Sequence, residues 1–274
     1  MAGPDEREIL LGRPTPVVDA YSPELLYPIP RAPARRDLGL GEPLPFVGVD
    51  VWYAYELSWL DPTGKPVARV GRFTVPASSP NMVESKSFKL YLNSLNNTRL
   101  EGDDAASEVI RRDVGAVVGT PVGLALFGPD DPGLGGVSPH GVCLDPLPVT
   151  VPEGEPRPEL LALAGNGIVE EELYSHLLRS LCPVTGQPDW ATVWVHYRGR
   201  PVDRSALLGY ILAFRRHQAF HEQCVERIYH DIRERCQPEY LAVQALYTRR
   251  GGLDISPLRS SDATAEPLPR LNRQ

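Results

Sequence analysis

Hydrophobic positions along the chain follow two periods, an alternation typical of strands and a three-to-four-residue spacing typical of helices. In the first half, aromatic and β-branched residues alternate on both sides of a Pro-Thr-Gly turn at 62–64, which predicts a β-hairpin. A helical pattern follows, in which Asp103 or Asp104 is expected to act as an N-cap. The elements predicted here are strands over 46–60 and 66–77, helices over 86–95 and 103–119, and strands over 121–127 and 141–147.

The second half repeats this order of elements with little residue identity. One helix carries a stripe spaced by four residues, Phe220, Cys224, Ile228 and Ile232, which predicts one buried face. Both halves therefore follow the order ββααββ. The elements predicted here are strands over 168–180 and 191–199, helices over 203–216 and 221–236, and strands over 239–248 and 254–258.

The 29 prolines divide the chain, because proline is excluded from helix interiors and central strands. Proline is frequent before the first hairpin and again between the two halves. The predicted organisation is an extended N-terminal arm at 1–45, a first module at 46–127, a Pro/Gly-rich connection at 128–158, and a second module with an irregular tail at 159–274.

The composition of this α+β chain restricts its expected cell compartment and the kinds of ligand expected to bind. Its 274 residues carry a net charge of −7, which argues against a large nucleic-acid-binding surface. No apolar run approaches the ~18 residues of a membrane span, and the N-terminus carries acids where a signal peptide needs bases. Four cysteines are too few for a disulfide scaffold. A cytoplasmic protein is expected, with neither membrane nor direct nucleic-acid binding.

The segment ESKSFKLY is the first candidate site. Ser85 and Lys86 stand at a predicted helix start, where free N–H groups and the helix dipole favour an anion. An ordinary capped helix with a solvated lysine explains the same pattern.

The loop LCPVTGQPDW is the second candidate site. Proline and glycine force an irregular loop, across which the carboxylate of Asp189 can approach the thiol of Cys182 and exchange a proton with it. A lone cysteine is more often a small core residue. Spacing alone therefore leaves a structural role open.

Two shorter motifs complete the candidates. In FHEQC, a zinc site of Cys182, His221 and Cys224 is conceivable, but the chain has no C-x-x-C motif. In TRRGG, Arg250 can bind phosphate and Gly251 allows close backbone approach, although a polar turn explains the motif equally well.

Four longer stretches together resemble the two-module form of the 7-cyano-7-deazaguanine reductases, the nitrile reductases of queuosine biosynthesis. The resemblance runs from about Phe46 to the C-terminus. It implies an α+β protein of tandem tunnelling-fold modules, with antiparallel sheets and helices on one face, and a homodimer. The stretches are VESKSFKLYLNSLNNTR, SLCPVTGQPDWATVWVHYRGR, FRRHQAFHEQCVERIYHDI and YTRRGGLDISPLRS.

The resemblance also implies a chemistry, the NADPH-dependent reduction of a nitrile to a primary amine with two hydrides. Cys182 is expected to add to the nitrile carbon and Asp189 to move the protons, giving a covalent thioimide. The implied substrate-binding residues are Val83, Glu84, Ser85, His221 and Glu222, with Glu222 as the anchor of the guanine-like base. The implied cofactor-binding residues are Ser85, Lys86, Arg250 and Gly251, and no metal is required.

Two other functions stay open at this point. The same fold hosts zinc-dependent pterin-type hydrolases, for which the sequence offers the weak Cys182–His221–Cys224 set. A non-catalytic purine-binding module would keep Glu222 but would not need Cys182 and Asp189 together.

Overall fold

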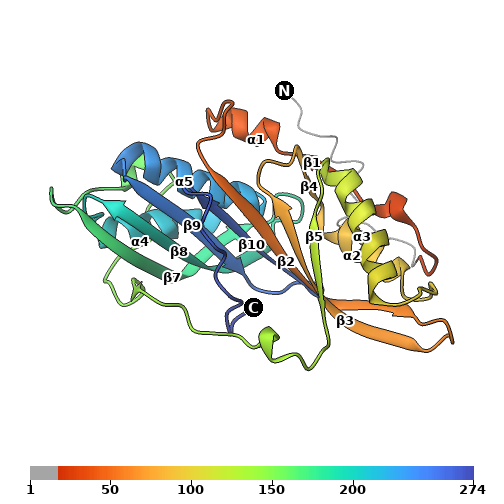
Figure 1. Cartoon of the computed structure of the whole chain (residues 1–274). Coiled ribbons are helices and arrows are strands. Elements are labelled where there is room, and N and C mark those ends of the chain that lie inside the picture. Colours follow the sequence, from red (N-terminus) through yellow and green to blue (C-terminus); the bar gives the residue numbers. More distant parts are fainter. Residues whose placement is uncertain (1–17) are drawn as a thin grey trace. The chain divides into compact units, whose positions relative to one another are not determined.

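The computed structural model describes residues 18–274 (Figure 1). The strands are β1 (Pro28–Pro30), β2 (Val47–Leu60), β3 (Pro66–Pro76), β4 (Asn81–Val83), β5 (Gly123–Phe127), β6 (Val142–Cys143), β7 (Val169–Leu181), β8 (Pro188–Gly199), β9 (Tyr240–Tyr247) and β10 (Leu253–Ser260). The α-helices are α1 (Ala32–Asp37), α2 (Ser85–Ser94), α3 (Asp103–Val118), α4 (Arg204–Leu212) and α5 (His221–Cys236). Short 3-10 helices are η1 (Pro23–Leu25), η2 (Pro132–Leu134), η3 (Pro158–Leu160) and η4 (Ala213–Arg216).

The chain forms two compact units, neither of which is one continuous stretch. Unit 1 contains the N-terminal part through Arg36, residues 50–135 and residues 249–255. Unit 2 contains residues 37–49, 136–248 and 256–274. Strands β2 and β10 each begin in one unit and end in the other. Residues 249–255, which the predicted boundaries assign to the second module, thus belong to unit 1.

In unit 1 the strands β5, β3 and β2 are neighbours in that order. The predicted hairpin between β2 and β3 is confirmed: the Asp61 N–H donates to the Lys65 carbonyl and the Gly64 N–H donates to the Asp61 carbonyl, each at 2.9 Å. Gly64 has a φ of 92°, which glycine adopts without strain. The Asp61 carboxylate also accepts the Thr63 N–H at 2.9 Å. The turn is therefore fixed by local hydrogen bonds.

The helices α2 and α3 are confirmed, but the predicted cap of α3 is wrong. Gly102 is the N-cap and makes no side-chain capping bond. Asp103 and Asp104 lie in the first turn, where their negative charge still stabilises the helix through its dipole. The carboxylate of Asp103 pairs instead with the Arg69 guanidinium at 2.9 Å.

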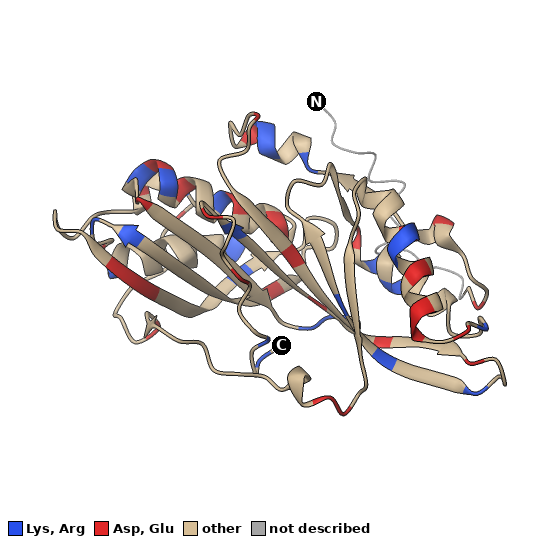
Figure 2. Ribbon diagram, in the orientation of Figure 1, with Lys and Arg blue, Asp and Glu red and all other residues tan. Residues whose placement is uncertain are grey.

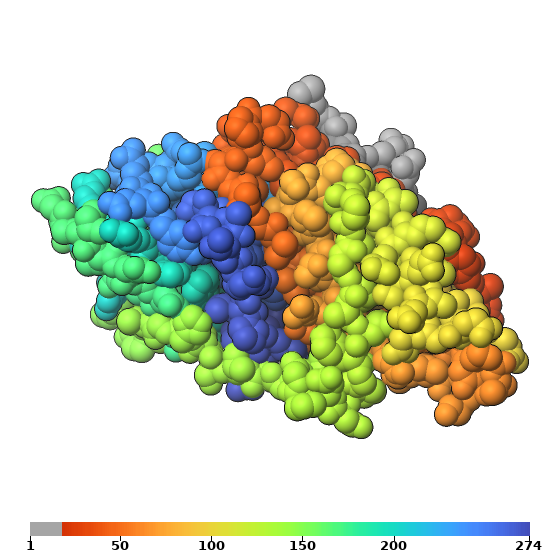
Figure 3. All heavy atoms as spheres, viewed as in Figure 1, coloured from red at the N-terminus to blue at the C-terminus, as the bar shows by residue number. Residues whose placement is uncertain are grey.

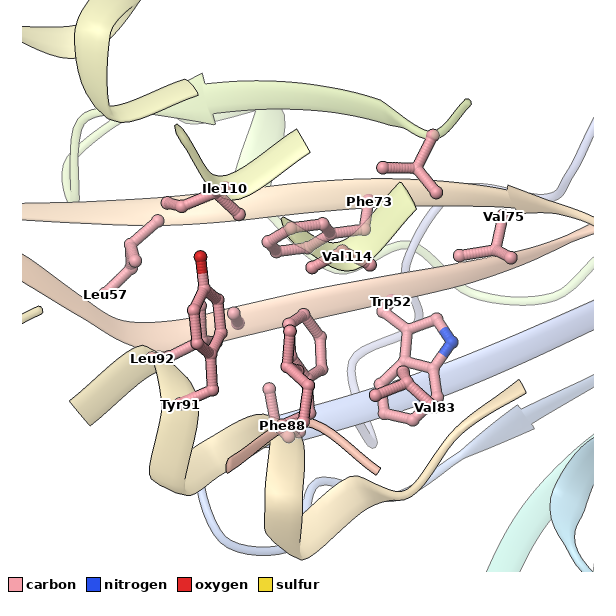
Figure 4. Close-up of a cluster of buried hydrophobic side chains, with 14 of the residues drawn as sticks. Trp52, Leu57, Phe73, Val75, Val83, Phe88, Tyr91, Leu92, Ile110 and Val114 are labelled. Atoms are coloured by element: carbon pink, nitrogen blue, oxygen red, sulfur yellow. The ribbon is translucent and has the colours of Figure 1, made fainter. Parts of the chain in front are cut away.

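A hydrophobic core fills unit 1 between its strands and these two helices (Figure 4). Phe88 of α2 packs edge-on against Trp52 of β2 and Phe73 of β3, with ring centroids 5.6 Å and 5.0 Å apart. The Tyr91 hydroxyl donates to the Asp113 carboxylate at 2.7 Å, so this buried hydroxyl is satisfied. This packing fixes α2, the helix that carries the first candidate site.

The N-terminal arm was predicted to be extended through residue 45. Residues 1–17 of that arm lie outside the described part. The rest contains η1, α1 and β1, which pairs with β4 in a two-stranded sheet. The guanidinium of Arg31 pairs with the buried Asp50 carboxylate at 2.5 Å. These contacts hold residues 22–35 against unit 1.

In unit 2 the strand order is β10-β9-β8-β7-β6. The neighbours from β10 to β7 pair antiparallel, as predicted. The predicted strand over 141–147 differs: only Val142 and Cys143 form a strand, and they pair parallel with β7 instead of closing the first half. Helix α5 lies against β9, and its predicted stripe is buried at Cys224, Ile228 and Ile232 (Figure 1).

The C-terminal segment after β10 contains neither helix nor strand, as predicted, yet parts of it are buried. Leu271 is 2% exposed, and the Gln274 side-chain amide donates to the Ser256 hydroxyl at 2.8 Å. This dark blue segment is visible on the surface of unit 2 in Figure 3. It therefore packs against unit 2 without regular structure.

The α+β class with antiparallel sheets and tandem modules is confirmed by these units. Acidic and basic residues are interspersed on α3 and α5, the outer faces of which are charged (Figure 2). Within residues 18–274, no helix is both long and apolar enough to cross a membrane.

Candidate active site

The hairpin of β7 and β8 positions the candidate nucleophile. Cys182 directly follows β7 and is 3% exposed. Its N–H donates to the Gln187 carbonyl at 2.8 Å, and its carbonyl accepts the Gly186 N–H at 2.9 Å. Gly186 has a φ of 67°, a conformation that side chains disfavour. The backbone therefore closes a tight loop that begins at Cys182.

Strand register places Asp189 on the same face as Cys182. Asp189 pairs with Ser180 across the hairpin, and Cys182 lies two residues beyond Ser180. Side chains two residues apart share a face, and such diagonal neighbours have Cα atoms about 7–8 Å apart. The Asp189 side chain is buried. The predicted thiol–carboxylate pairing is thus compatible with the register.

Helix α5 begins with two predicted residues, His221 and Glu222. The Nε2 of His221 lies 3.2 Å from the Asp189 Oδ2. Glu222 is 4% exposed in the first turn, where a carboxylate is favoured by the helix dipole. The Phe220 N–H donates to the Gln223 Oε1 at 3.1 Å, which closes the helix start. The Asp189 carboxylate and the His221 imidazole therefore meet, and the buried Glu222 is the next residue along the helix.

Sequence reasoning missed Tyr247, the ring of which stacks on His221. The two rings are stacked, with centroids 3.8 Å apart and an interplanar angle of 19°. Tyr247 pairs with Ala191 on β8, so its side chain shares the face of Asp189. The predicted strand over 239–248 was the available signal, but it did not single out Tyr247.

Behind the site, Tyr247 faces a second thiol. Burial raises the pKa of Cys224 to about 11, because an apolar surrounding disfavours the thiolate. Burial also raises the pKa of Tyr247, and the neighbouring Cys224 adds to that shift. Within the described chain, the buried hydroxyls of Tyr247 and Ser180 make no hydrogen bond of good geometry. Cys224 is therefore an inert neighbour of the site at neutral pH.

The first candidate site lies in unit 1, at the start of α2. Val83 ends β4, and Glu84 is the buried N-cap of α2. The Glu84 carboxylate accepts the Lys86 N–H at 2.9 Å and the Ser87 N–H at 2.6 Å. The free N–H groups expected to hold an anion are therefore partly used by Glu84. An anion near this helix start depends on side chains such as Lys86, which is half-buried beside Ser85.

Residues 249–252 of the TRRGG motif also lie in unit 1, beside α2. A Cβ on Gly251 would lie 3.4 Å from the Cδ of Lys89, one helical turn after Lys86. The Arg250 N–H donates to the Leu253 carbonyl at 2.8 Å, which closes a turn. The Arg249 guanidinium lies 3.4 Å from the ring centroid of Tyr55. Cationic side chains thus gather where the loop meets α2.

The predicted residues therefore form two groups, one in each unit. Unit 2 contains Cys182, Asp189, His221 and Glu222, of which Asp189 and His221 are in contact, and unit 1 contains Val83, Glu84, Ser85, Lys86, Arg250 and Gly251. Among residues 18–274, no group of three or more His, Cys, Asp or Glu side chains is arranged to hold a metal ion.

Comparison with known proteins decides the family. A family model described as "Nitrile reductase, 7-cyano-7-deazaguanine-reductase N-term" matches residues 17–126, and one described as "QueF-like protein" matches residues 188–266. The NADPH-dependent 7-cyano-7-deazaguanine reductase of Dechloromonas aromatica (strain RCB) is 55% identical over 94% of this chain and 92% of that protein. The chain belongs to the NADPH-dependent 7-cyano-7-deazaguanine reductases.

Further relatives of the same name support this membership. The reductase of Bordetella pertussis is 54% identical over 94% of both chains, and that of Azoarcus sp. (strain BH72) is 52% identical over 92% of this chain and 90% of the relative. A crystal structure titled as the archaeosine synthase QueF-Like in the apo form matches with a TM-score of 0.32 and 16% identity, over 37% of this chain and 99% of that chain. A likeness at that level supports no further conclusion.

Membership confirms the predicted resemblance, an NADPH-dependent oxidoreductase built as two tandem tunnelling-fold modules. It also decides against the pterin-type hydrolase and the silent purine-binding module. The roles of individual residues stay predictions.

Proposed function

We propose that the Cys182–Asp189–His221–Glu222 group of this reductase converts the nitrile of 7-cyano-7-deazaguanine to the aminomethyl group of 7-aminomethyl-7-deazaguanine, a step of queuosine biosynthesis for tRNA modification. The contact of Asp189 with His221 at 3.2 Å, on the face that Cys182 shares, carries the proposal. A thiol, a proton-transferring carboxylate and a buried polar anchor are the groups that covalent nitrile chemistry needs.

The first step belongs to Cys182 and Asp189. The carboxylate of Asp189 accepts the thiol proton, and the thiolate sulfur forms a bond to the nitrile carbon. One π bond of the nitrile breaks, and its electron pair goes to nitrogen, which takes the proton from Asp189. The product is a thioimide on Cys182. Atoms and charge balance without a further reactant.

The base anchor is assigned to Glu222, with His221 beside it. A guanine-like base presents an N1–H and a 2-amino group, and a carboxylate accepts both hydrogen bonds. Glu222 is buried, so such bonds form away from competing water. His221, held between Tyr247 and Asp189, closes the same end of the pocket.

The NADPH-holding residues are assigned to unit 1. Lys86 and Arg250 bring positive charge to the start of α2 and the adjoining loop, where Lys89 is paired with the Glu56 carboxylate at 3.0 Å, and Gly251 keeps the backbone accessible. This local charge fits the phosphates of a dinucleotide in a chain of net charge −7. NADPH supplies the two hydrides of the reduction when bound. Val83, Glu84 and Ser85 stay proposed as substrate-binding residues.

The enzyme is proposed to act in the cytoplasm, as a homodimer that binds no nucleic acid directly. The acidic net charge supports the last point, because nucleic-acid binding needs a large basic surface. The small free base, rather than tRNA, is then the substrate.

Intact-mass spectrometry tests the proposal. Wild-type protein mixed with 7-cyano-7-deazaguanine in the absence of NADPH is expected to gain the mass of one substrate molecule. Cys182→Ala is expected to gain none. Cys143→Ala, a half-buried cysteine on β6, is the matched control and is expected to form the adduct normally. An adduct on Cys182→Ala would overturn the mechanism.

A further inference from the structure

Unit 2 contains a cavity that the proposed reaction does not use. Its volume is about 630 Å³, within the range of small-molecule sites. It lies between the loop 151–154, the end of β7 and the 3-10 helix η4. Its lining residues are Val151, Pro152, Glu153, Gly154, Arg179, Ala213, Arg215 and Arg216. We call it the arginine cavity.

The arginine cavity carries an uncompensated positive charge. Three guanidiniums face one carboxylate, that of Glu153, in a chain that is acidic overall. Among residues 18–274, the ion pairs engage other arginines, and none joins these three to a carboxylate. The neighbouring Glu155 pairs with His217 at 2.6 Å. The lining of the cavity therefore carries more positive than negative charge.

Two of the three arginines, Arg179 and Arg215, are held together despite their like charge. The Arg179 Nη1 donates to the Arg215 carbonyl at 2.7 Å. The guanidiniums of Arg179 and Arg215 lie 5.9 Å and 5.7 Å from the ring centroid of Trp190, where the aromatic face attracts cations. A cluster fixed in this way is preorganised for an anion, because its donors need not be gathered on binding.

The cavity is distinct from the proposed substrate pocket but coupled to it through the backbone. Arg179 and Ser180 alternate along β7, so Arg179 points to the face opposite Ser180 and Cys182. The Leu181 N–H donates to the His217 carbonyl at 2.8 Å, so the segment that carries Arg215 is bonded to the residue before Cys182. A ligand bound to these arginines would therefore affect the position of the Cys182 loop.

We propose that the arginine cavity binds the phosphate groups of a small molecule. Guanidinium forks bind phosphate oxygens through paired hydrogen bonds. The uncharged substrate base has no group of this kind. The phosphates belong either to the dinucleotide or to a separate phosphorylated ligand, and the test separates these two sources.

Isothermal titration of the substrate-free protein with inorganic pyrophosphate tests the proposal. Wild-type protein is expected to bind at one saturable site, with affinity that falls as salt is raised. Arg216→Gln and Arg215→Gln are each expected to weaken binding at least about tenfold, and Arg216→Lys by less. Arg198→Gln, an exposed arginine of unit 2 that pairs with Glu239, is the matched control and should bind normally.

Absence of saturable binding, or an equal loss in Arg198→Gln and Arg216→Gln, would overturn the proposal. Competition identifies the source: displacement of pyrophosphate by 2′,5′-ADP assigns the cavity to the dinucleotide, and independent binding of both assigns it to a separate ligand. Adduct formation at Cys182 is measured separately, so failure here is distinguishable from failure of the proposed reaction.

Discussion

Replacing Tyr247 tests whether ring stacking orients His221. The rings lie 3.8 Å apart, and Tyr247 is 1% exposed. Aromatic pairs contribute about 0.5–1.5 kcal/mol beyond their buried area. If that energy holds the imidazole toward Asp189, its loss lowers the correctly oriented population by about 2–13-fold, at 1.36 kcal/mol per factor of ten.

Two substitutions separate the ring from the hydroxyl. Tyr247→Phe keeps the stack and removes a hydroxyl without a well-formed hydrogen bond in the described chain, so the free energy of unfolding should change by no more than about 1 kcal/mol. Tyr247→Leu removes the stack and should lower the free energy of unfolding by less than the about 3–5 kcal/mol that truncation of a buried aromatic residue to alanine costs.

The assay measures the rate of adduct formation at Cys182 per folded molecule, with urea unfolding in parallel. Tyr247→Phe should react like wild type, and Tyr247→Leu should be about 2–13-fold slower. Equal rates in both variants would refute the positioning role. A slower Tyr247→Phe would instead assign the function to the hydroxyl.

Three more outcomes are expected. Asp189→Asn should slow adduct formation about 10²–10⁴-fold with an unchanged circular dichroism spectrum, and a rate within a few-fold of wild type would remove Asp189 from the mechanism. Cys224, with a pKa of about 11, should resist iodoacetamide at pH 8, where about 0.1% of it is thiolate, and rapid labelling of the native protein would contradict this. The same raised pKa should lower the free energy of unfolding between pH 9 and 11, because only the unfolded chain releases the Cys224 proton there. Asp50→Ala should lower the free energy of unfolding in urea by about 3–5 kcal/mol, because it leaves the buried Arg31 charge without its carboxylate. The double variant Arg31→Met/Asp50→Leu should lower it clearly less, and equal losses would be evidence against an unpaired buried charge.

Elements with a long, regular pattern were predictable from the sequence. Helix α5 begins and ends at the predicted residues, because the stripe at Cys224, Ile228 and Ile232 has one consistent helical face. The hairpin at 62–64 was predictable because its turn is fixed by local hydrogen bonds. Both signals are contained in a few neighbouring residues.

Features that depend on distant pairing were not predictable in the same way. The two-residue strand at Val142 acquires its place only by pairing with Leu173 on β7. Arg250 belongs to unit 1 because the β9–β10 loop returns there: the Tyr55 N–H donates to the Gly252 carbonyl at 2.9 Å. Tyr247 required the register with Ala191 before its ring could be placed beside His221.

The two thiols of this face show how position decides reactivity. Cys224 lies inside α5, fully buried beside the Tyr247 ring, and burial keeps it protonated well above neutral pH. Cys182 stands where β7 ends, and its own N–H and carbonyl are both used to close the loop to Gly186 and Gln187. The backbone thereby fixes the Cα of Cys182 while its side chain shares a face with a buried carboxylate. Composition made the four cysteines equivalent, and strand register distinguishes Cys182 by the buried carboxylate on its face, which is why we propose it as the nucleophile.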